Sequence, residues 1–189
     1  MAATWRIKEA TSNGDGDTLS TIGIEELRIT FRNRAADEAV FTIPGDTYHA
    51  APGANFTFTH GVQYAITKDG TVVFIGRVAS ISHAAETPNH RRTVRLLGGW
   101  AELEQYVYVQ NWKQGSGNTS GSRSRVILGL SSSGGPVSFD SQILDIAGCA
   151  GSVSLAAADC DVASGTGKAM PYDEQVDLTC AEALKRVLA

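Results

Sequence analysis

The chain has 189 residues, of which 42% are hydrophobic and 19% charged, and its formal net charge is −4. This length fits one large domain, or one domain with a smaller second part, and the acidic balance argues against a domain that mainly grips nucleic-acid phosphates. The sequence has no apolar run of about 18 residues, which a membrane span needs, and its first residues lack the apolar stretch of a signal peptide.

The residues up to 112 have the patterning of an antiparallel β-domain. Leu27, Ile29 and Phe31 alternate with polar residues, which is the period of a half-buried strand. Asp69-Gly70 separates two β-favouring runs and is a strong signal for a two-residue hairpin turn. Gly76 predicts a bulge or a close backbone approach within its strand.

The expected strands lie near Trp5 and Ile7 and at 27–31, 39–43, 62–68, 71–83, 91–97 and 106–109, with one helical turn at 100–104. Short strands of this number and spacing predict a sandwich or a barrel. The predicted core consists of Leu27, Ile29, Phe31, Ile75, Val94 and Leu96.

Composition changes after Trp112. All aromatic residues except Phe139 and Tyr172 precede residue 113, and the stretch 113–124 is rich in Gly and Ser. Such a stretch is typical of a linker or an exposed loop. We therefore expect a β-barrel or sandwich domain at 1–112, a Gly/Ser-rich loop or linker at 113–124, and a mixed α+β segment at 125–189 that is a candidate for a truncated second domain. The alternative is one domain with a long hairpin loop.

The segment 125–189 is expected to contain a strand at 126–130 and a helix at 141–147 that Gly148 ends. A second helix is expected to begin at Thr179, which forms a T-x-x-E capping box with Glu182. Its apolar residues run to the last position without a capping glycine. We therefore expect this helix either to pack on residues 126–158 or to leave an apolar patch for a missing downstream part of a longer protein.

Two motifs resemble ligand-binding loops but are incomplete. The stretch Asn13–Asp17 resembles a calcium loop, yet Thr18 and Ile24 stand where an EF-hand needs Gly and Glu. The stretch Gly165–Lys168 resembles the end of a phosphate-binding loop, which Val162 and Ala169 break. The spacing of the four histidines does not match a helical zinc motif. We expect no metal and no cofactor.

The three cysteines allow more than one interpretation. Cys149 and Cys160 are a candidate pair in an oxidising compartment, but the odd count favours reduced thiols. Cys180 lies in the first turn of the last predicted helix, where the helix dipole lowers a thiol pKa. No histidine is near it in the sequence, so a buried structural thiol is the favoured interpretation. We expect no catalytic residue.

Two clusters are candidates for contacts. Arg28, Arg32, Arg91 and Arg95 predict a cationic stripe, for which we favour a solvated sheet face neutralised by Glu25, Glu26 and Glu102 over nucleic-acid contact. The second cluster is aromatic and consists of Trp100, Tyr106, Tyr108 and Trp112. It predicts a sugar platform or a protein interface, with about half of it in the core. The candidate interface residues are Trp100, Tyr106, Tyr108, Trp112, Leu184, Val187 and Leu188.

The order of these elements resembles the N-terminal domain of phage tail and baseplate hub proteins, the group that includes the late control gene D family. The residues that carry the resemblance are the F-x-G-x-V pattern of Phe74, Gly76 and Val78 and the W-x-x-L-E pattern of Trp100, Leu103 and Glu104. The likeness covers roughly 20–112 and 171–189.

The resemblance implies a tail-tube-like β-barrel and a structural role in a phage or prophage tail. A hub of this kind joins the tail tube to the tail tip, contacts other tail proteins, and forms a ring, commonly a trimer. It is assembled in the bacterial cytoplasm and needs no catalytic residue. The alternatives are a carbohydrate-binding β-sandwich module and, less favoured, a cysteine hydrolase that uses Cys180.

Overall fold

The computed structural model describes residues 3–44, 57–84, 91–111, 122–123, 125–130, 137–150 and 173–189. The chain forms two compact units, Met1–Gly99 and Trp100–Ala189, which we call unit 1 and unit 2. The division between them precedes the expected boundary at residue 112. Most of the 113–124 stretch lies outside the described residues.

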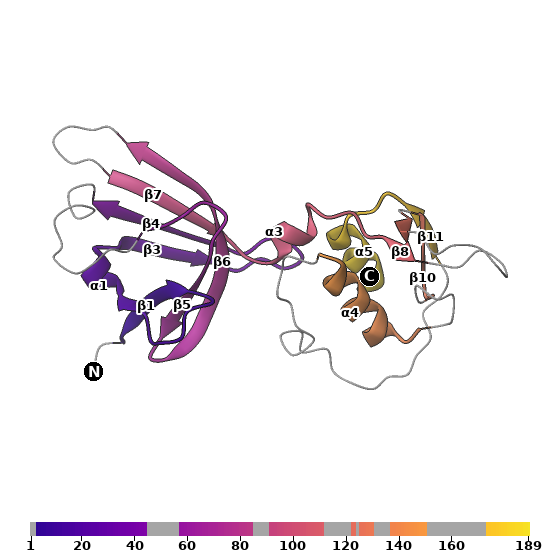
Figure 1. Ribbon diagram of the computed structural model, residues 1–189, viewed down its shortest axis with the longest axis horizontal. Helices are drawn as coiled ribbons and strands as arrows, with labels where there is room; N and C mark the ends of the chain where they lie inside the picture. The colour runs from indigo at the N-terminus through magenta and orange to yellow at the C-terminus, as the bar shows by residue number, and fades with distance from the viewer. Residues whose placement is uncertain are drawn as a thin grey trace. The chain divides into compact units, whose positions relative to one another are not determined.

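Unit 1 is built on one antiparallel sheet of seven strands, in the order β2-β1-β5-β6-β7-β4-β3 (Figure 1). The elements are β1 (Trp5–Glu9), β2 (Asp17–Thr18), α1 (Leu19–Ile22), β3 (Glu25–Thr30), β4 (Glu38–Pro44), β5 (Gln63–Lys68), β6 (Thr71–Ala84) and β7 (Arg91–Leu97). The prediction of a mainly antiparallel β fold is confirmed. Within the described residues, however, the sheet does not close into a barrel, and β2 and β3 lie at its two ends.

The long strand β6 joins the two halves of this sheet. It has 14 residues and pairs with β5 through its first half and with β7 through its second half. Its register with β7 shifts between Val78 and Ser80, and such a bulge increases the local twist of a strand.

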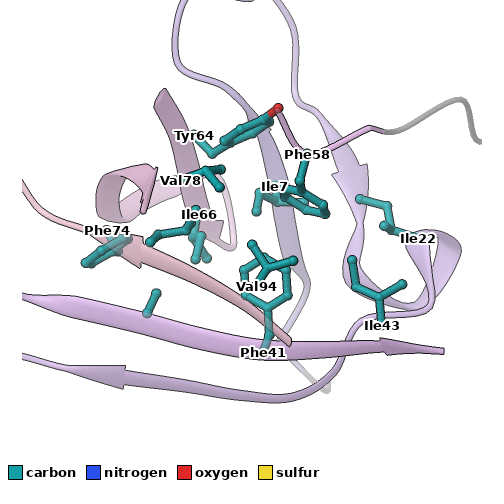
Figure 2. Packing of buried hydrophobic residues seen from close by; sticks show 12 residues of the cluster. Ile7, Ile22, Phe41, Ile43, Phe58, Tyr64, Ile66, Phe74, Val78 and Val94 are labelled. Carbon is teal, nitrogen blue, oxygen red and sulfur yellow. The ribbon is translucent and has the colours of Figure 1, made fainter. Parts of the chain in front are cut away.

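Side chains from the two halves meet in one core (Figure 2). Phe58 packs between two other rings, with its centroid 5.1 Å from that of Phe41 and 5.0 Å from that of Tyr64. Val94 and Leu96 are buried in this core as predicted. The core residues are Ile7, Ile22, Ala39, Phe41, Ile43, Phe58, Tyr64, Ile66, Phe74, Val78, Val94 and Leu96.

Gly76 allows the ring of Phe74 to lie against the strand. A Cβ atom at Gly76 would lie 2.5 Å from Cε1 of Phe74 and 2.8 Å from the carbonyl oxygen of Leu97. The predicted close approach is therefore confirmed. Phe74, Gly76 and Val78 all face the core, so Ile75 faces the other way and is 44% exposed. The prediction of a core position for Ile75 is wrong.

Phe31 is also outside the predicted core, with 62% of its surface exposed. The last residue pair of β3 joins Thr30 to Glu38, and Phe31 follows the end of the strand. The period-2 pattern continues through Phe31 in the sequence, but the strand ends one residue before it. The pattern therefore does not predict the position of this ring. Leu27 and Ile29, within the strand, are half-buried and pack against the core.

Unit 2 combines short strands with two longer helices. Its elements are α3 (Trp100–Leu103), β8 (Gln110–Asn111), β9 (Ser122–Arg123), β10 (Arg125–Leu128), α4 (Phe139–Cys149), β11 (Asp173–Val176) and α5 (Cys180–Val187). The strands form two pairs, β8-β9 and β10-β11. Helix α4 continues through Gly148, where we expected it to stop, because that glycine keeps a negative φ.

Helix α5 docks on the rest of unit 2. Its apolar residues share one core with Val126, Leu128, Ile146 and Ala150, so the expectation that it packs on 126–158 is confirmed for the described residues of that range. The predicted capping box is present: the Thr179 amide donates to Glu182 Oε2 at 2.9 Å, and the Glu182 amide donates to Thr179 Oγ1 at 3.1 Å.

The expected strand at 106–109 is instead an extended segment. The Tyr108 amide donates to the Leu178 carbonyl, and the Cys180 amide donates to the Tyr106 carbonyl, both at 2.8 Å. A single bridge joins Val107 to Thr179.

None of the helices in the described part of the chain has the length and apolarity to cross a membrane.

Candidate interaction surface

The aromatic cluster is divided between surface and interior. Tyr108 is fully buried, whereas Tyr106 is 38% exposed. The ring of Trp100 is half-buried and lies 5.8 Å from Nζ of Lys185. Trp112 lies outside the described residues. A sugar platform needs several exposed rings, and Tyr106 alone supplies one among the described members of this cluster.

The apolar residues of α5 are divided in the same way. Leu184 and Val187 are buried in the core of unit 2, and Leu188 is 39% exposed. Leu188 and Tyr106 are therefore the most exposed of the predicted interface residues that the structure describes.

The buried hydroxyl of Tyr108 is held by polar side chains. It donates to Oδ2 of Asp145. It accepts from Nε2 of Gln142 at 2.8 Å and from Nε2 of Gln110 at 3.1 Å. Burial is the main cause, and the hydrogen bond to Asp145 the second cause, that raises the pKa of this phenol far above its ordinary value. The hydroxyl therefore stays protonated and acts as a structural donor.

The two glutamines also bind the backbone around β10. Gln110 accepts from the Ile127 amide at 2.8 Å and donates to the Leu130 carbonyl at 3.0 Å. Gln142 accepts from the Gly129 amide at 3.0 Å. Because buried amides and carbonyls need partners, these side chains complete the hydrogen bonding of this segment. This cluster is a structural network that the sequence analysis did not identify.

On the outer face of unit 1, a carboxylate joins two strands. Glu38 on β4 accepts from Nη2 of Arg32 at 2.7 Å and from Nε of Arg95 on β7 at 2.5 Å. The hydrogen bond from Arg95 is the main cause that lowers the pKa of Glu38. Arg91 lies 3.9 Å from Glu25. Glu38 and the expected Glu25 thus pair with three of the four arginines that predict the cationic stripe.

An open groove of about 500 Å³ runs along the outer side of β3 and β4. Phe31 follows the last residue of β3 and is not one of the residues that line this groove. The groove is lined by Glu26, Arg28, Thr30, Arg32, Glu38, Val40, Phe41 and Thr42. We call the groove, the edge of β3 and Phe31 together the β3 surface.

The β3 surface combines three features of a protein interface. It has a strand at the end of the sheet, an exposed aromatic ring, and charged side chains held in fixed positions by ion pairs. Edge strands offer unpaired backbone groups to a second chain, and aromatic residues are enriched at interfaces. The surface is therefore suited to binding another protein.

The calcium-like loop uses its carbonyl groups internally. Nζ of Lys8 donates to the Gly14 carbonyl at 2.7 Å, and Nη1 of Arg6 donates to the Gly16 carbonyl at 2.8 Å. Two cationic side chains of β1 thus bind carbonyl groups of this loop. In the described ranges, no cluster of three or more His, Cys, Asp or Glu side chains could hold a metal ion. The stretch Gly165–Lys168 lies outside those ranges.

Cys180 is fully buried at the start of α5. Burial, followed by the neighbouring Cys149 thiol, raises the pKa of Cys180 to about 12. Desolvation of the thiolate therefore outweighs the helix dipole, and the burial that we favoured for Cys180 is confirmed. This raised pKa makes Cys180 a poor nucleophile at neutral pH.

No protein-family model matches the chain, and no curated protein matches it in sequence. Among solved structures, the chain is similar to the tail protein from Neisseria meningitidis MC58, with a TM-score of 0.39 and 11% sequence identity. The similar region covers 56% of this chain and 27% of that protein, so the chain spans about a quarter of its length.

Proposed function

We propose that the chain is a structural component of a phage or prophage tail, a hub or baseplate protein that joins the tail tube to the tail tip. In this proposal it acts by binding other tail proteins and copies of itself, in a ring that is a trimer. It carries out no catalysis.

The order of elements in unit 1 supports this proposal. The F-x-G-x-V pattern that carries the resemblance to tail hubs lies at the centre of the sheet, on β6, where Phe74 and Val78 are core residues. Three of the residues behind the resemblance therefore lie on the strand that joins the two halves of the sheet.

The observation that carries the proposal is the β3 surface. Phe31 is 62% exposed beside an end strand of the sheet. An exposed aromatic ring beside an end strand of a sheet is a liability for a protein that stays alone, whereas a subunit of an assembly covers it. We expect this surface to be buried against a neighbouring subunit of the tail.

Light scattering on the longest gene product that contains this sequence tests the proposal. We expect a closed oligomer at micromolar concentration, and we expect Phe31→Glu to shift it towards the monomer without unfolding it. The matched control is Val176→Glu, since Val176 is 59% exposed on β11 of the other unit. A wild-type monomer, or equal effects of the two substitutions, would contradict the proposal.

A further inference from the structure

Two cysteines that are distant in the sequence meet in unit 2. Cys149 is the last residue of α4, and Cys180 is the first residue of α5. Cys149 packs against the same core cluster that contains Cys180, and neither residue forms a disulfide in this structure.

The extended segment at 106–109 brings both residues to one place. Sγ of Cys149 lies 4.0 Å from the Val107 carbonyl and 3.9 Å from the Val109 carbonyl. The Cys180 amide donates to the Tyr106 carbonyl at 2.8 Å. Both cysteines therefore contact the same short segment and pack in the same core, which places them near each other in unit 2.

We propose that Cys149 and Cys180 are a redox-active dithiol whose oxidation by a small-molecule disulfide forms a bond that ties the end of α4 to the start of α5. This inference does not depend on the proposed role in a phage tail. It also differs from the pairing of Cys149 with Cys160 that the sequence suggested.

The exposure of the two residues sets the order of the reaction. Cys149 is half-buried and Cys180 is fully buried, so an oxidant in solution reaches Cys149 first. The Cys149 thiolate attacks oxidised glutathione, forms a mixed disulfide, and releases one glutathione thiolate. The Cys180 thiolate then attacks Sγ of Cys149 and releases the second glutathione.

The step is balanced in atoms and electrons. Two protein thiols lose two protons and two electrons and form one S–S bond, while oxidised glutathione gains them and becomes two thiols. The raised pKa of Cys180 makes the second attack slow at neutral pH. Its rate should increase as the pH rises towards that pKa.

The experiment uses the full chain with Cys160→Ser, which leaves only the two proposed partners among the three cysteines. The reduced protein is incubated with oxidised glutathione at mildly alkaline pH. We expect both free thiols to disappear, peptide mapping to link Cys149 to Cys180 without bound glutathione, and thermal unfolding to shift upward by roughly 5 °C. The bond should reform after reduction and renewed oxidation.

The single variants are the controls. Cys149→Ser and Cys180→Ala, each in the Cys160→Ser background, should retain one thiol and show no upward shift on oxidation. Glutathione that remains attached to Cys149, or two thiols that persist in the folded protein, would overturn the proposal. In the wild-type chain, a preferred bond to Cys160 would overturn it as well.

Discussion

The side-chain amide of Gln142 on α4 donates a hydrogen bond of 2.8 Å to the hydroxyl of Tyr108, and both residues are buried. The same glutamine accepts from the Gly129 amide. One side chain thereby links a helix, the extended segment and the end of β10. Polar groups in such a network are costly to leave without partners.

We expect Gln142→Leu to lower the free energy of unfolding by about 1–3 kcal/mol, because the Gly129 amide would be left buried without its acceptor. Denaturant unfolding followed by circular dichroism measures this change. Gln105→Leu is the matched control, since Gln105 is exposed, and its effect should stay within about 0.5 kcal/mol. Equal effects would show that the network contributes little.

Gly76→Ala should destabilise unit 1 by about 1–3 kcal/mol, because the new methyl group would meet the Phe74 ring and the Leu97 carbonyl at less than normal contact distance. The thermal unfolding temperature reports the change. A variant as stable as the wild type would mean that this part of the sheet is less tightly packed than described.

A glycine in α4 should respond in the opposite direction. A Cβ atom at Gly148 would meet no atom within 4 Å, and glycine is a poor helix former. We therefore expect Gly148→Ala to stabilise the protein by about 0.5–1 kcal/mol in the same assay. A loss of stability would indicate that the last turn of α4 is not helical in solution.

Local patterns in the sequence predicted the parts of the fold that depend on neighbouring residues. The hairpin turn at Asp69-Gly70 has φ values of 50° and 82°, and the capping box at Thr179 is present. Each of these signals arises from the backbone requirements of two to four residues, so it can be read without the tertiary structure.

The sequence could not predict features that depend on where a strand ends or on what lies beside it. The alternation through Phe31 is the same as in a buried strand, and only the end of the pairing at Thr30 exposes that ring. The glycine at position 76 could have indicated that Phe74, and not Ile75, faces the core, because the Phe74 ring needs the space beside that glycine. Nothing in the sequence indicated that Gln110 and Gln142 are buried, or that Cys149 meets Cys180.

Alkaline pH should destabilise the protein. The pKa of Cys180 is raised from 9.0 to about 12, and that of Tyr108 is raised above its ordinary 10.0. Above about pH 9 the unfolded chain therefore loses protons that the folded chain keeps, so stability is complete below that pH and falls as the pH rises.

Denaturant midpoints at about pH 8 and about pH 11 measure this fall. Cys180→Ala should show a smaller fall than the wild type, whatever its own stability at the lower pH. An equal or larger fall in the variant would contradict the assignment of a protonated, buried thiol at this position.

The central claim is that the protein is part of a phage tail. Immunogold electron microscopy, with an antibody against this chain, on particles released from the host or phage that carries the gene tests it most directly. We predict label at the tail tip, where tube and tip join, and none on particles from a strain in which the gene is disrupted. Intact tails without label, or normal tails in the disrupted strain, would contradict the claim.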